Sequence, residues 1–494
     1  MTRLILGPFN RIEGDLEVEL EVHDERIVEA RVKAPMFRGF EIMLAGRDPM
    51  DALTIVPRIC GICSVSQSVA AARALADASG VVMPANGQHA TNLMLACENL
   101  ADHLTHFYVF FMPDFTREVY AGRPWYGQAQ RRFAAVIGGH AGSGLHNRAA
   151  LAQRARWLEL MGTLGGKWPH TGAILPGGTS RAIEATEGVR LLAGLREMRA
   201  FLEQTLFGAA LEEVAALDSV AALQRCAARA PGSDLALFLE IAADAGLINM
   251  GPGPGRYLSY GAYAQSAGGH VLGQGVWDAA LQQRLLLDAA QISEDMCHAW
   301  LAEGQTGMPL HPLDGLTQVQ PDKAGAYTWN KAPRLAGQVM ETGAIARQLV
   351  DGQALIHDLV RAHGGTVYTR VLARLLELAR ILPLMEHWLL ALQPRETYHL
   401  VQAMPQQGQG SGLSEAARGA LGHWIRIENG CIASYQIVAP TSWNFSPRDA
   451  AGTPGALEAA LVGARIDSAQ GRGQSVAVQH IVRSFDPCMV CTVH

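Results

Sequence analysis

Charge is scarce in this chain, since Asp, Glu, Lys and Arg together make up 17% of its 494 residues. The net charge is -6 and the Lys and Arg residues are scattered, so no basic stripe is available to follow a phosphate backbone. We therefore expect no nucleic-acid partner. The hydrophobic fraction of 49% excludes overall disorder and favours a large core, a buried partner face, or both.

Long hydrophobic runs are missing as well. The most apolar stretch, ILPLMEHWLLAL, is interrupted by Glu386 and His387, and a membrane span takes about 18 apolar residues. The opening, MTRLILGPFNR, is broken by Gly7, Pro8 and Asn10, and it shows no secretory signal. We therefore expect a cytoplasmic protein that does not itself span a membrane.

Internal repeats, low-complexity tracts and composition steps are absent from the sequence. We predict a single domain over residues 1–494, mainly α within the α+β class, with a large helical bundle core and peripheral β hairpins. Alternating apolar and polar residues predict an N-terminal β hairpin at about 15–34. Helical patterns begin at about residue 52 and recur at roughly 146–163, 183–207, 276–303, 339–363 and 368–393. The glycine-rich stretches near about 251 and 406 are predicted as loops.

Cysteine is sparse, with 8 residues, and no disulfide framework is indicated. Four cysteines stand alone and are expected to be small buried hydrophobic residues: Cys97, Cys226, Cys297 and Cys431. The other four form two CxxC pairs more than four hundred residues apart: Cys60 and Cys63, and Cys488 and Cys491. If all four share one site, the fold must carry the C-terminal tail into the interior.

The spacing of the two pairs leaves several kinds of site open. The first pair precedes a predicted helix, whose N-terminus favours the thiolate that binds metal. A structural zinc with four thiolates, a redox CxxC and an iron-sulfur cluster are the alternatives. The apolar residues around both pairs and the missing glycine after each second cysteine count against structural zinc.

Five stretches together resemble the large subunits of nickel-iron hydrogenases: RIEG (11–14), FRGFE (37–41), RICGIC (58–63), ARGALGHW (417–424) and the terminal DPCMVCTVH. They span essentially the whole chain. The resemblance implies a hydrogenase, an oxidoreductase with H2 as substrate. Because this chain has no second set of cysteines for iron-sulfur clusters, it also implies a small subunit that carries them. A dimer of such heterodimers is one assembly that fits.

The resemblance assigns a role to each paired cysteine. Cys60 and Cys488 are implied as terminal nickel ligands, and Cys63 and Cys491 as bridges to an iron that carries carbon monoxide and cyanide. Soft thiolate ligands stabilise nickel while its oxidation state changes. Heterolytic splitting of H2 releases a proton, which a terminal thiolate can accept and Glu13 of RIEG would carry outward.

Further residues take their roles from the same resemblance. Arg418 is the guanidinium placed over the metal pair, where a permanent charge can polarise H2. Asp102 and Asp486 position it, and Thr441 donates a hydrogen bond to a cyanide nitrogen. Without the resemblance, Asp102 would be an ordinary polar helix residue.

The final residue also has an implied role. His494 is a ligand of a magnesium-like ion, together with Glu41 and the backbone carbonyl of Ile437. Such an ion would tie down a tail that otherwise frays.

Several positions depart from the family's usual pattern. Asp15 follows RIEG in place of a histidine, and Gln67 replaces a histidine that hydrogen-bonds a bridging thiolate. Ile62 and Phe110 are bulkier than usual and would narrow the route by which gas reaches the metals. For these two the alternative is simple core packing.

The departures resemble the regulatory, H2-sensing branch of the family. We therefore expect the large subunit of a sensor that splits H2 slowly and signals its availability to a histidine kinase. The alternative is an uptake hydrogenase that oxidises H2 for energy metabolism.

Overall fold

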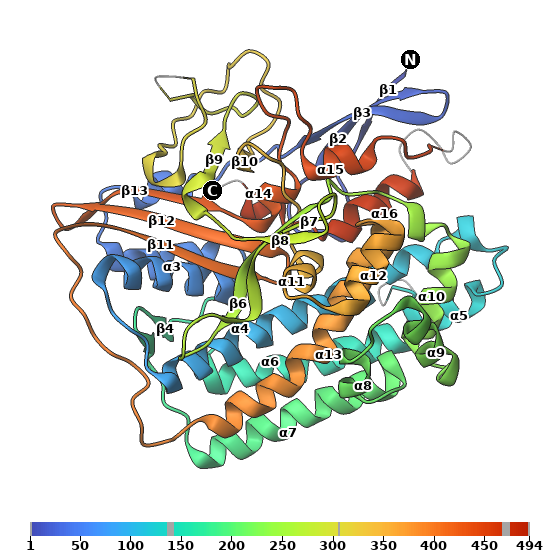
Figure 1. The fold of residues 1–494 in the computed structure, drawn as a ribbon, viewed down its shortest axis with the longest axis horizontal. Helices are drawn as coiled ribbons and strands as arrows, with labels where there is room; N and C mark the ends of the chain where they lie inside the picture. Colours follow the sequence, from blue (N-terminus) through green and yellow to red (C-terminus); the bar gives the residue numbers. More distant parts are fainter. Residues whose placement is uncertain (1, 136–142, 305–306, 467–474, 493–494) are drawn as a thin grey trace.

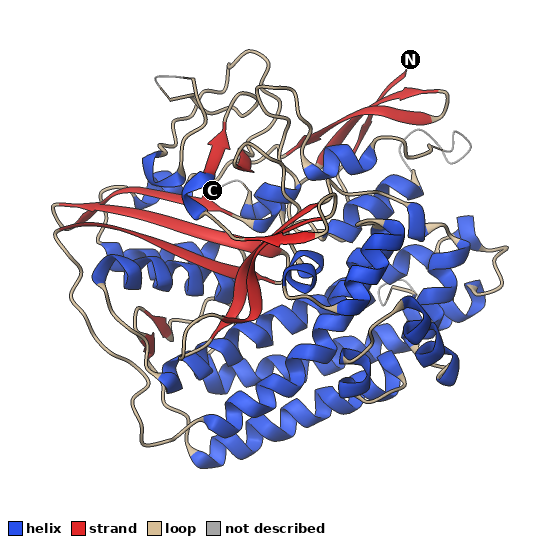
Figure 2. Cartoon of the chain, in the orientation of Figure 1, coloured by secondary structure: helices blue, strands red, loops and turns tan. Residues whose placement is uncertain are grey.

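The fold is built on a bundle of long helices. The structure is a computed structural model, and it describes residues 2–135, 143–304, 307–466 and 475–492. Four helices lie side by side in the lower half of Figure 1: α4 (Ala85–Thr105), α6 (Leu145–Gly165), α7 (Ala185–Phe201) and α13 (Val367–Ala391). Their apolar faces form the largest core cluster. The predicted helical bundle core is thus confirmed, and Figure 2 shows the sheets that accompany it.

Helix α13 runs through the middle of this bundle. It begins at a capping box formed by Thr366 and Thr369, and its leucines pack against α4 and α7. The same helix buries Arg370, Arg374 and Glu377. A charged group in an apolar core requires a partner. These three side chains of α13 therefore form hydrogen bonds and ion pairs with residues outside the helix bundle.

A three-stranded antiparallel sheet crosses above the bundle (Figure 1) and consists of β11 (Gln407–Ala416), β12 (Gly419–Glu428) and β13 (Cys431–Val438). Helix α3 (Ser64–Ser79) packs on β11. A Cβ atom on Gly410 or Gly412 would lie 2.1 or 1.9 Å from a backbone oxygen of α3. The loop predicted near 406 is therefore wrong, because these glycines allow a helix to approach a strand and do not form a turn.

A second region also departs from the predicted elements. The strands β6 (Arg256–Ala264), β7 (His270–Asp278) and β8 (Gln283–Leu285) form one antiparallel sheet, and β9 (Ile292–Asp295) pairs with β10 (Ala332–Leu335). The helix predicted at 276–303 is wrong. The loop predicted near 251 is present at 251–255, but the residues that follow it form β6. Pairing between strands has overridden a weak local helical preference here. The helix predicted at 339–363 is split into α11 (Ala344–Val350) and α12 (Ala354–His363) by a turn at Gly352, where φ is 81°.

The N-terminal segment forms a third antiparallel sheet from β1 (Thr2–Leu6), β2 (Glu17–His23) and β3 (Arg26–Lys33). Strand β1 was not anticipated. That residues 1–494 make one domain stays a prediction. The remaining helices and strands are α1 (Phe40–Leu44), α2 (Ala52–Ile55), α5 (Tyr126–Phe133), β4 (Ile174–Leu175), β5 (Gly178–Thr179), α8 (Leu211–Ala215), α9 (Val220–Arg229), α10 (Asp234–Asp244), α14 (Pro440–Asn444), α15 (Ala456–Leu461) and α16 (Val476–Phe485). Among the described residues, none of the helices has the length and apolar character that crossing a membrane requires.

The contact between β11 and α3 predicts the effect of a single added methyl group. Gly412→Ala should lower the free energy of unfolding by about 1–3 kcal/mol, because the strand and helix must separate to admit the Cβ. Gly162→Ala is the control, since Gly162 is exposed on α6 with open space around it and should change stability by less than about 1 kcal/mol. Denaturant unfolding measures both, and equal midpoints for the two variants would contradict the tight contact.

Candidate metal centre

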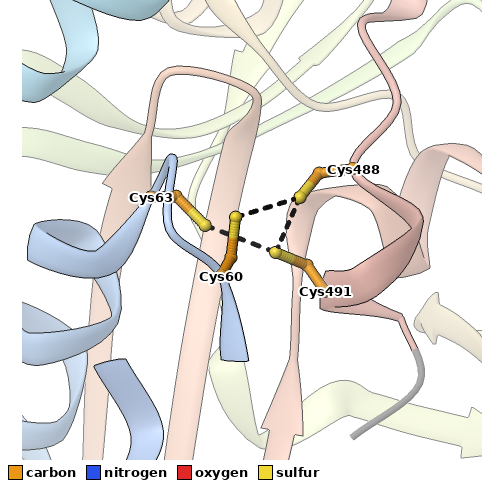
Figure 3. A group of neighbouring side chains, drawn as sticks. All are labelled: Cys60, Cys63, Cys488 and Cys491. Atoms are coloured by element: carbon orange, nitrogen blue, oxygen red, sulfur yellow. Dashed lines mark hydrogen bonds between the residues drawn. The ribbon is translucent and has the colours of Figure 1, made fainter. Parts of the chain in front are cut away.

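The two CxxC pairs meet in the interior, with their sulfurs directed toward one another (Figure 3). The Sγ of Cys60 lies 3.4 Å from that of Cys488, Cys63 lies 3.3 Å from Cys491, and Cys488 lies 3.0 Å from Cys491. All four sulfurs fall within 4.8 Å of one another and all four residues are buried. The tail is therefore carried inside, as a shared site requires.

The first pair is held by the start of helix α3 and by a buried acid. Cys63 is the residue just before α3. Glu98, on α4, accepts hydrogen bonds from the backbone N–H groups of Val65 and Ser66, both at 2.8 Å, and from the Ser66 hydroxyl at 2.9 Å. Burial raises the pKa of Glu98 to about 7, although these hydrogen bonds oppose the shift. Glu98 thus anchors the helix that follows the cysteines. Sequence reasoning missed it, because α4 carries several other polar residues and an acid among them gives no signal of its role.

The second pair is held by the N-terminal RIEG segment. The backbone N–H of Met489 donates to the carbonyl of Glu13 at 2.7 Å, and Glu13 and Cys488 form a parallel bridge. Gly14 leaves little room beside it, since a Cβ there would lie 2.9 Å from the nitrogen of Val490. These contacts fix the position of the second cysteine pair.

A hydroxyl on α14 secures Cys488 from another side. The backbone N–H of Cys488 donates to Thr441 Oγ1 at 3.1 Å. A hydroxyl that accepts this bond keeps its own hydrogen to donate. Thr441 therefore stands beside the cysteines with one donor at its disposal.

Arg418 occupies the two-residue turn between β11 and β12, where Ala416 pairs with Gly419. Its Nη1 lies 3.0 Å from Asp102, and its Nη2 lies 3.1 Å from the carboxylate of Asp486. Its Nε donates to the backbone carbonyl of Asp486 at 3.0 Å. The three predicted residues are thus brought together, and all three are buried.

The charges of this group depend on one another. Burial alone would lower the pKa of Arg418, but the carboxylates of Asp102 and Asp486 and the sulfurs of Cys488 and Cys60 raise it well above its usual value. Burial opposes ionisation of Asp486 too, yet Arg418 outweighs it and lowers the pKa. Arg418 is therefore a permanent positive charge beside the cysteines.

The sulfurs themselves fit a cationic metal. The pKa of Cys60 is well below that of a free thiol, because the neighbouring thiols, Cys488 first, donate hydrogen bonds to it. The pKa values of Cys63 and Cys491 are raised well above the usual value, mainly by their hydrogen bonds to Cys488. One thiolate is thus tolerated and further ones are not, unless positive charge is added between them. Soft divalent metals supply that charge and prefer such ligands.

Glu41 lies in a separate polar cluster. Its Oε1 accepts the backbone N–H of Ile437 at 2.8 Å, and the ammonium of Lys331 lies 3.1 Å from both of its oxygens. Lys331 also contacts Glu294 at 3.2 Å and Gln436 at 2.7 Å. Carboxylate and amide oxygens are the donors that magnesium prefers, and two carboxylates outnumber the single ammonium. Glu41 and Ile437 are therefore neighbours through the N–H of Ile437, and an ion held by the Ile437 carbonyl stays a prediction.

The remaining predicted residues are His494, Gln67, Ile62 and Phe110. His494 lies outside the described residues. Gln67 is buried on α3, one turn beyond Cys63, and its Oε1 lies 2.8 Å from Nε2 of His423. Ile62 is half-buried and packs against the cluster that contains the cysteines. Phe110 is also half-buried and lies in a π-helical turn that follows α4.

The lone cysteines only partly follow their prediction. Cys97 and Cys226 are buried as expected. Cys297 is half-buried, and Cys431 is exposed where β13 begins after a turn, so burial was the wrong prediction for Cys431. A strand that starts at a surface turn exposes its first residue.

Comparison with known proteins places the chain in a family. The model of the family described as nickel-dependent hydrogenase matches residues 38–123 and 145–494. The periplasmic NiFeSe hydrogenase large subunit of Desulfomicrobium baculatum is 29% identical, with 100% of this chain and 95% of that protein covered. The uptake hydrogenase large subunit of Rhodobacter capsulatus is 27% identical over the same shares of the two chains.

Solved structures agree with these relatives. The NiFeSe hydrogenase of Desulfovibrio vulgaris Hildenborough superposes with a TM-score of 0.82 and 29% sequence identity, and the match covers 100% of both chains. The predicted fold, that of a nickel-iron hydrogenase large subunit, is therefore confirmed. With its four buried cysteines positioned for metal binding, the chain belongs to the nickel-dependent hydrogenase family as a large subunit, an oxidoreductase acting on H2.

Proposed function

We propose that the chain splits H2 heterolytically at a nickel-iron centre held by its four paired cysteines. The observation that carries this proposal is the convergence of four buried sulfurs beside a buried guanidinium. Cys60 and Cys488 would be the terminal nickel ligands, and Cys63 and Cys491 the bridges to an iron with carbon monoxide and cyanide. When bound, the metal pair supplies the redox chemistry and the polarisation of H2.

The chain's own residues supply charge, orientation and a proton exit. Arg418 holds a permanent charge in a dry site, where electrostatic interactions are strong. Asp102 and Asp486 fix the plane of its guanidinium from two sides. Thr441 keeps a hydroxyl hydrogen for a cyanide nitrogen.

Glu13 would accept the proton released from H2. It is half-buried and runs beside Cys488 through its backbone. Burial raises its pKa, and the negative charge of Cys60 adds to the shift. A half-buried carboxylate with a raised pKa holds a proton more readily, and it would pass that proton outward.

A second ion completes the proposal. Glu41, the carbonyl of Ile437 and His494 would hold a magnesium-like ion, supported by the oxygen-rich surroundings of Glu41. The ion would link β13 to the tail.

The use of the centre is proposed to be H2 sensing in the cytoplasm. Hydrogenase large subunits pair with a small subunit; here that subunit would carry the iron-sulfur clusters, and a histidine kinase would read the state of the complex. Support comes from Gln67, Ile62 and Phe110, which differ from the residues usual in the family.

Uptake of H2 for energy metabolism is the second candidate, favoured by the similarity to an uptake hydrogenase large subunit. Slow, O2-insensitive turnover with a co-purifying kinase would favour sensing, whereas fast dye reduction that O2 inhibits would favour uptake.

Replacing a paired cysteine should remove the metals. Cys488→Ser exchanges a soft sulfur for a hard oxygen, so nickel content and H2-driven dye reduction should fall below about 1% of wild type. Cys431→Ser, at a lone exposed position, should retain both. Metal analysis of the purified heterodimer and infrared bands of carbonyl and cyanide check this, and a wild-type protein that holds zinc alone would refute the proposal.

Blocking the proton exit should slow turnover without loss of metal. Glu13→Gln keeps the shape but cannot accept a proton, so H2 oxidation should fall about 10²- to 10⁴-fold. In the wild type, turnover should decline as the pH falls through the raised pKa of Glu13, because the carboxylate is then already protonated. The variant should lose this acid limb. Glu21→Gln on β2 serves as control, and an unchanged pH profile in Glu13→Gln would exclude the role.

Reducing bulk near the metals should admit O2. The double variant Ile62→Val with Phe110→Leu should make H2 oxidation more sensitive to O2, while anaerobic turnover stays within about 10-fold of wild type. Ile241→Val, a similar trim in the buried face of α10, is the control. The measurement is the inhibition of H2 oxidation by O2 in an electrode cell. If the wild type, the double variant and the control are equally sensitive to O2, core packing is the role of Ile62 and Phe110.

A further inference from the structure

Helix α11 directs one arginine at the turn that carries Arg418. Arg347 Nη1 donates to the backbone carbonyl of Ala416 at 2.8 Å, and its Nη2 donates to that of Ala417 at 3.0 Å. Its Nη1 also donates to Glu415 at 2.7 Å. Three consecutive residues before Arg418 are therefore bonded to one guanidinium.

The same guanidinium forms a two-pronged bond with Glu377 on α13. Arg347 Nε and Nη2 donate to the two carboxylate oxygens, both at 2.9 Å. With the three contacts to the turn, five bonds match the five N–H groups of an arginine. Both side chains have 0% exposure, so no solvent competes for these bonds. A planar fork that is fully bonded allows little freedom to the groups around it.

Glu377 also reaches the partner of Arg418. Nε2 of His103 lies 3.2 Å from Glu377 Oε1, and His103 follows Asp102 on α4. Asp102 in turn lies 3.0 Å from Arg418. One carboxylate thus anchors both the turn that bears the guanidinium and the helix that bears its counter-ion.

The start of α11 leaves no room for the turn to move. A Cβ on Gly419 would lie 2.4 Å from the hydroxyl of Thr342 and 2.5 Å from the nitrogen of Gly343, the residue that precedes α11. The backbone of the turn therefore packs closely on the residues that precede α11, directly after Arg418.

We propose that Arg347 and Glu377 are positioning residues for Arg418, which set the place of its guanidinium at the metal centre. The inference rests on the proposed function, in which Arg418 faces the metals. Displacement of a reacting or polarising group by about 1 Å can cost about 10²-fold in rate. Neither residue touches the paired cysteines in the described contacts, so each would act through Arg418.

A matched arginine separates positioning from general stability. Arg334 is also buried, pairs with Asp449 at 3.0 Å, and bonds further to backbone carbonyls and a hydroxyl. Its described partners include neither Arg418 nor Asp102. At either position, replacement of arginine by lysine keeps the positive charge but removes the planar guanidinium and its paired hydrogen bonds.

The experiment compares Arg347→Lys with Arg334→Lys in the nickel-loaded heterodimer. Arg347→Lys should shift the carbonyl and cyanide infrared bands and lower kcat about 10- to 100-fold, with nickel content retained. Arg334→Lys should leave the bands in place even where it lowers the thermal midpoint. If Arg347→Lys does not assemble, Glu377→Gln, which keeps volume and removes the charge, should give the same band shift.

Three results would overturn the inference. Wild-type bands and kcat in a folded Arg347→Lys or Glu377→Gln would show that Arg418 does not depend on them. The same shift in Arg334→Lys would reduce the effect to general destabilisation. A wild-type protein without carbonyl and cyanide bands would overturn the proposed function together with this inference, so the two failures are distinguishable.

Discussion

Four thiols can share a dry interior only if positive charge lies among them. Their sulfurs are within 4.8 Å of one another, and burial strongly penalises an unpaired anion. Only Cys60 has a lowered pKa, whereas those of the other three are raised. The site is thus suited to bind cations, and Arg418 is a cation that the chain itself provides. The arrangement of sheet, bundle and tail follows from the need to bring these five groups together.

The tail is held by buried charged residues, and α13 supplies several of them. Arg374 donates to the carbonyl of Ser484 at 2.7 Å, and Arg370 pairs with Glu341 at 2.7 Å while its guanidinium lies over the ring of Phe485. These contacts secure the end of α16, from which the chain turns at Asp486 toward Cys488. Buried ion pairs are costly to desolvate and add little stability by themselves. Their role here is to fix the position at which α16 ends, and therefore the position of Cys488.

The sequence predicted features that depend on residues close together in the chain, and by itself it did not predict contacts between residues far apart. Two CxxC motifs predicted a metal site, because cysteine spacing limits what the sulfurs can do. Glu98 and Arg347 could not be found in that way, since their partners are distant in sequence and each looks like an ordinary charged helix residue. Gly410 and Gly412 were misassigned for a related reason, as glycine serves turns and close contacts alike. Periodicity identified the long helices but not the short strands between 256 and 295, which sheet pairing decides.

The contacts of Gln67 show how one substitution can alter the centre. Its oxygen faces Nε2 of His423, and Nδ1 of His423 lies 2.8 Å from the hydroxyl of Tyr435. If Tyr435 donates, His423 carries its hydrogen on Nε2 and gives it to Gln67. The Gln67 NH2 group then lies on the opposite side of the amide, buried and without a partner among the described residues. An amide can donate a hydrogen bond but cannot take up a proton as an imidazole does. Under the proposed sensing function, the missing proton acceptor at Gln67 would favour slow turnover over fast oxidation.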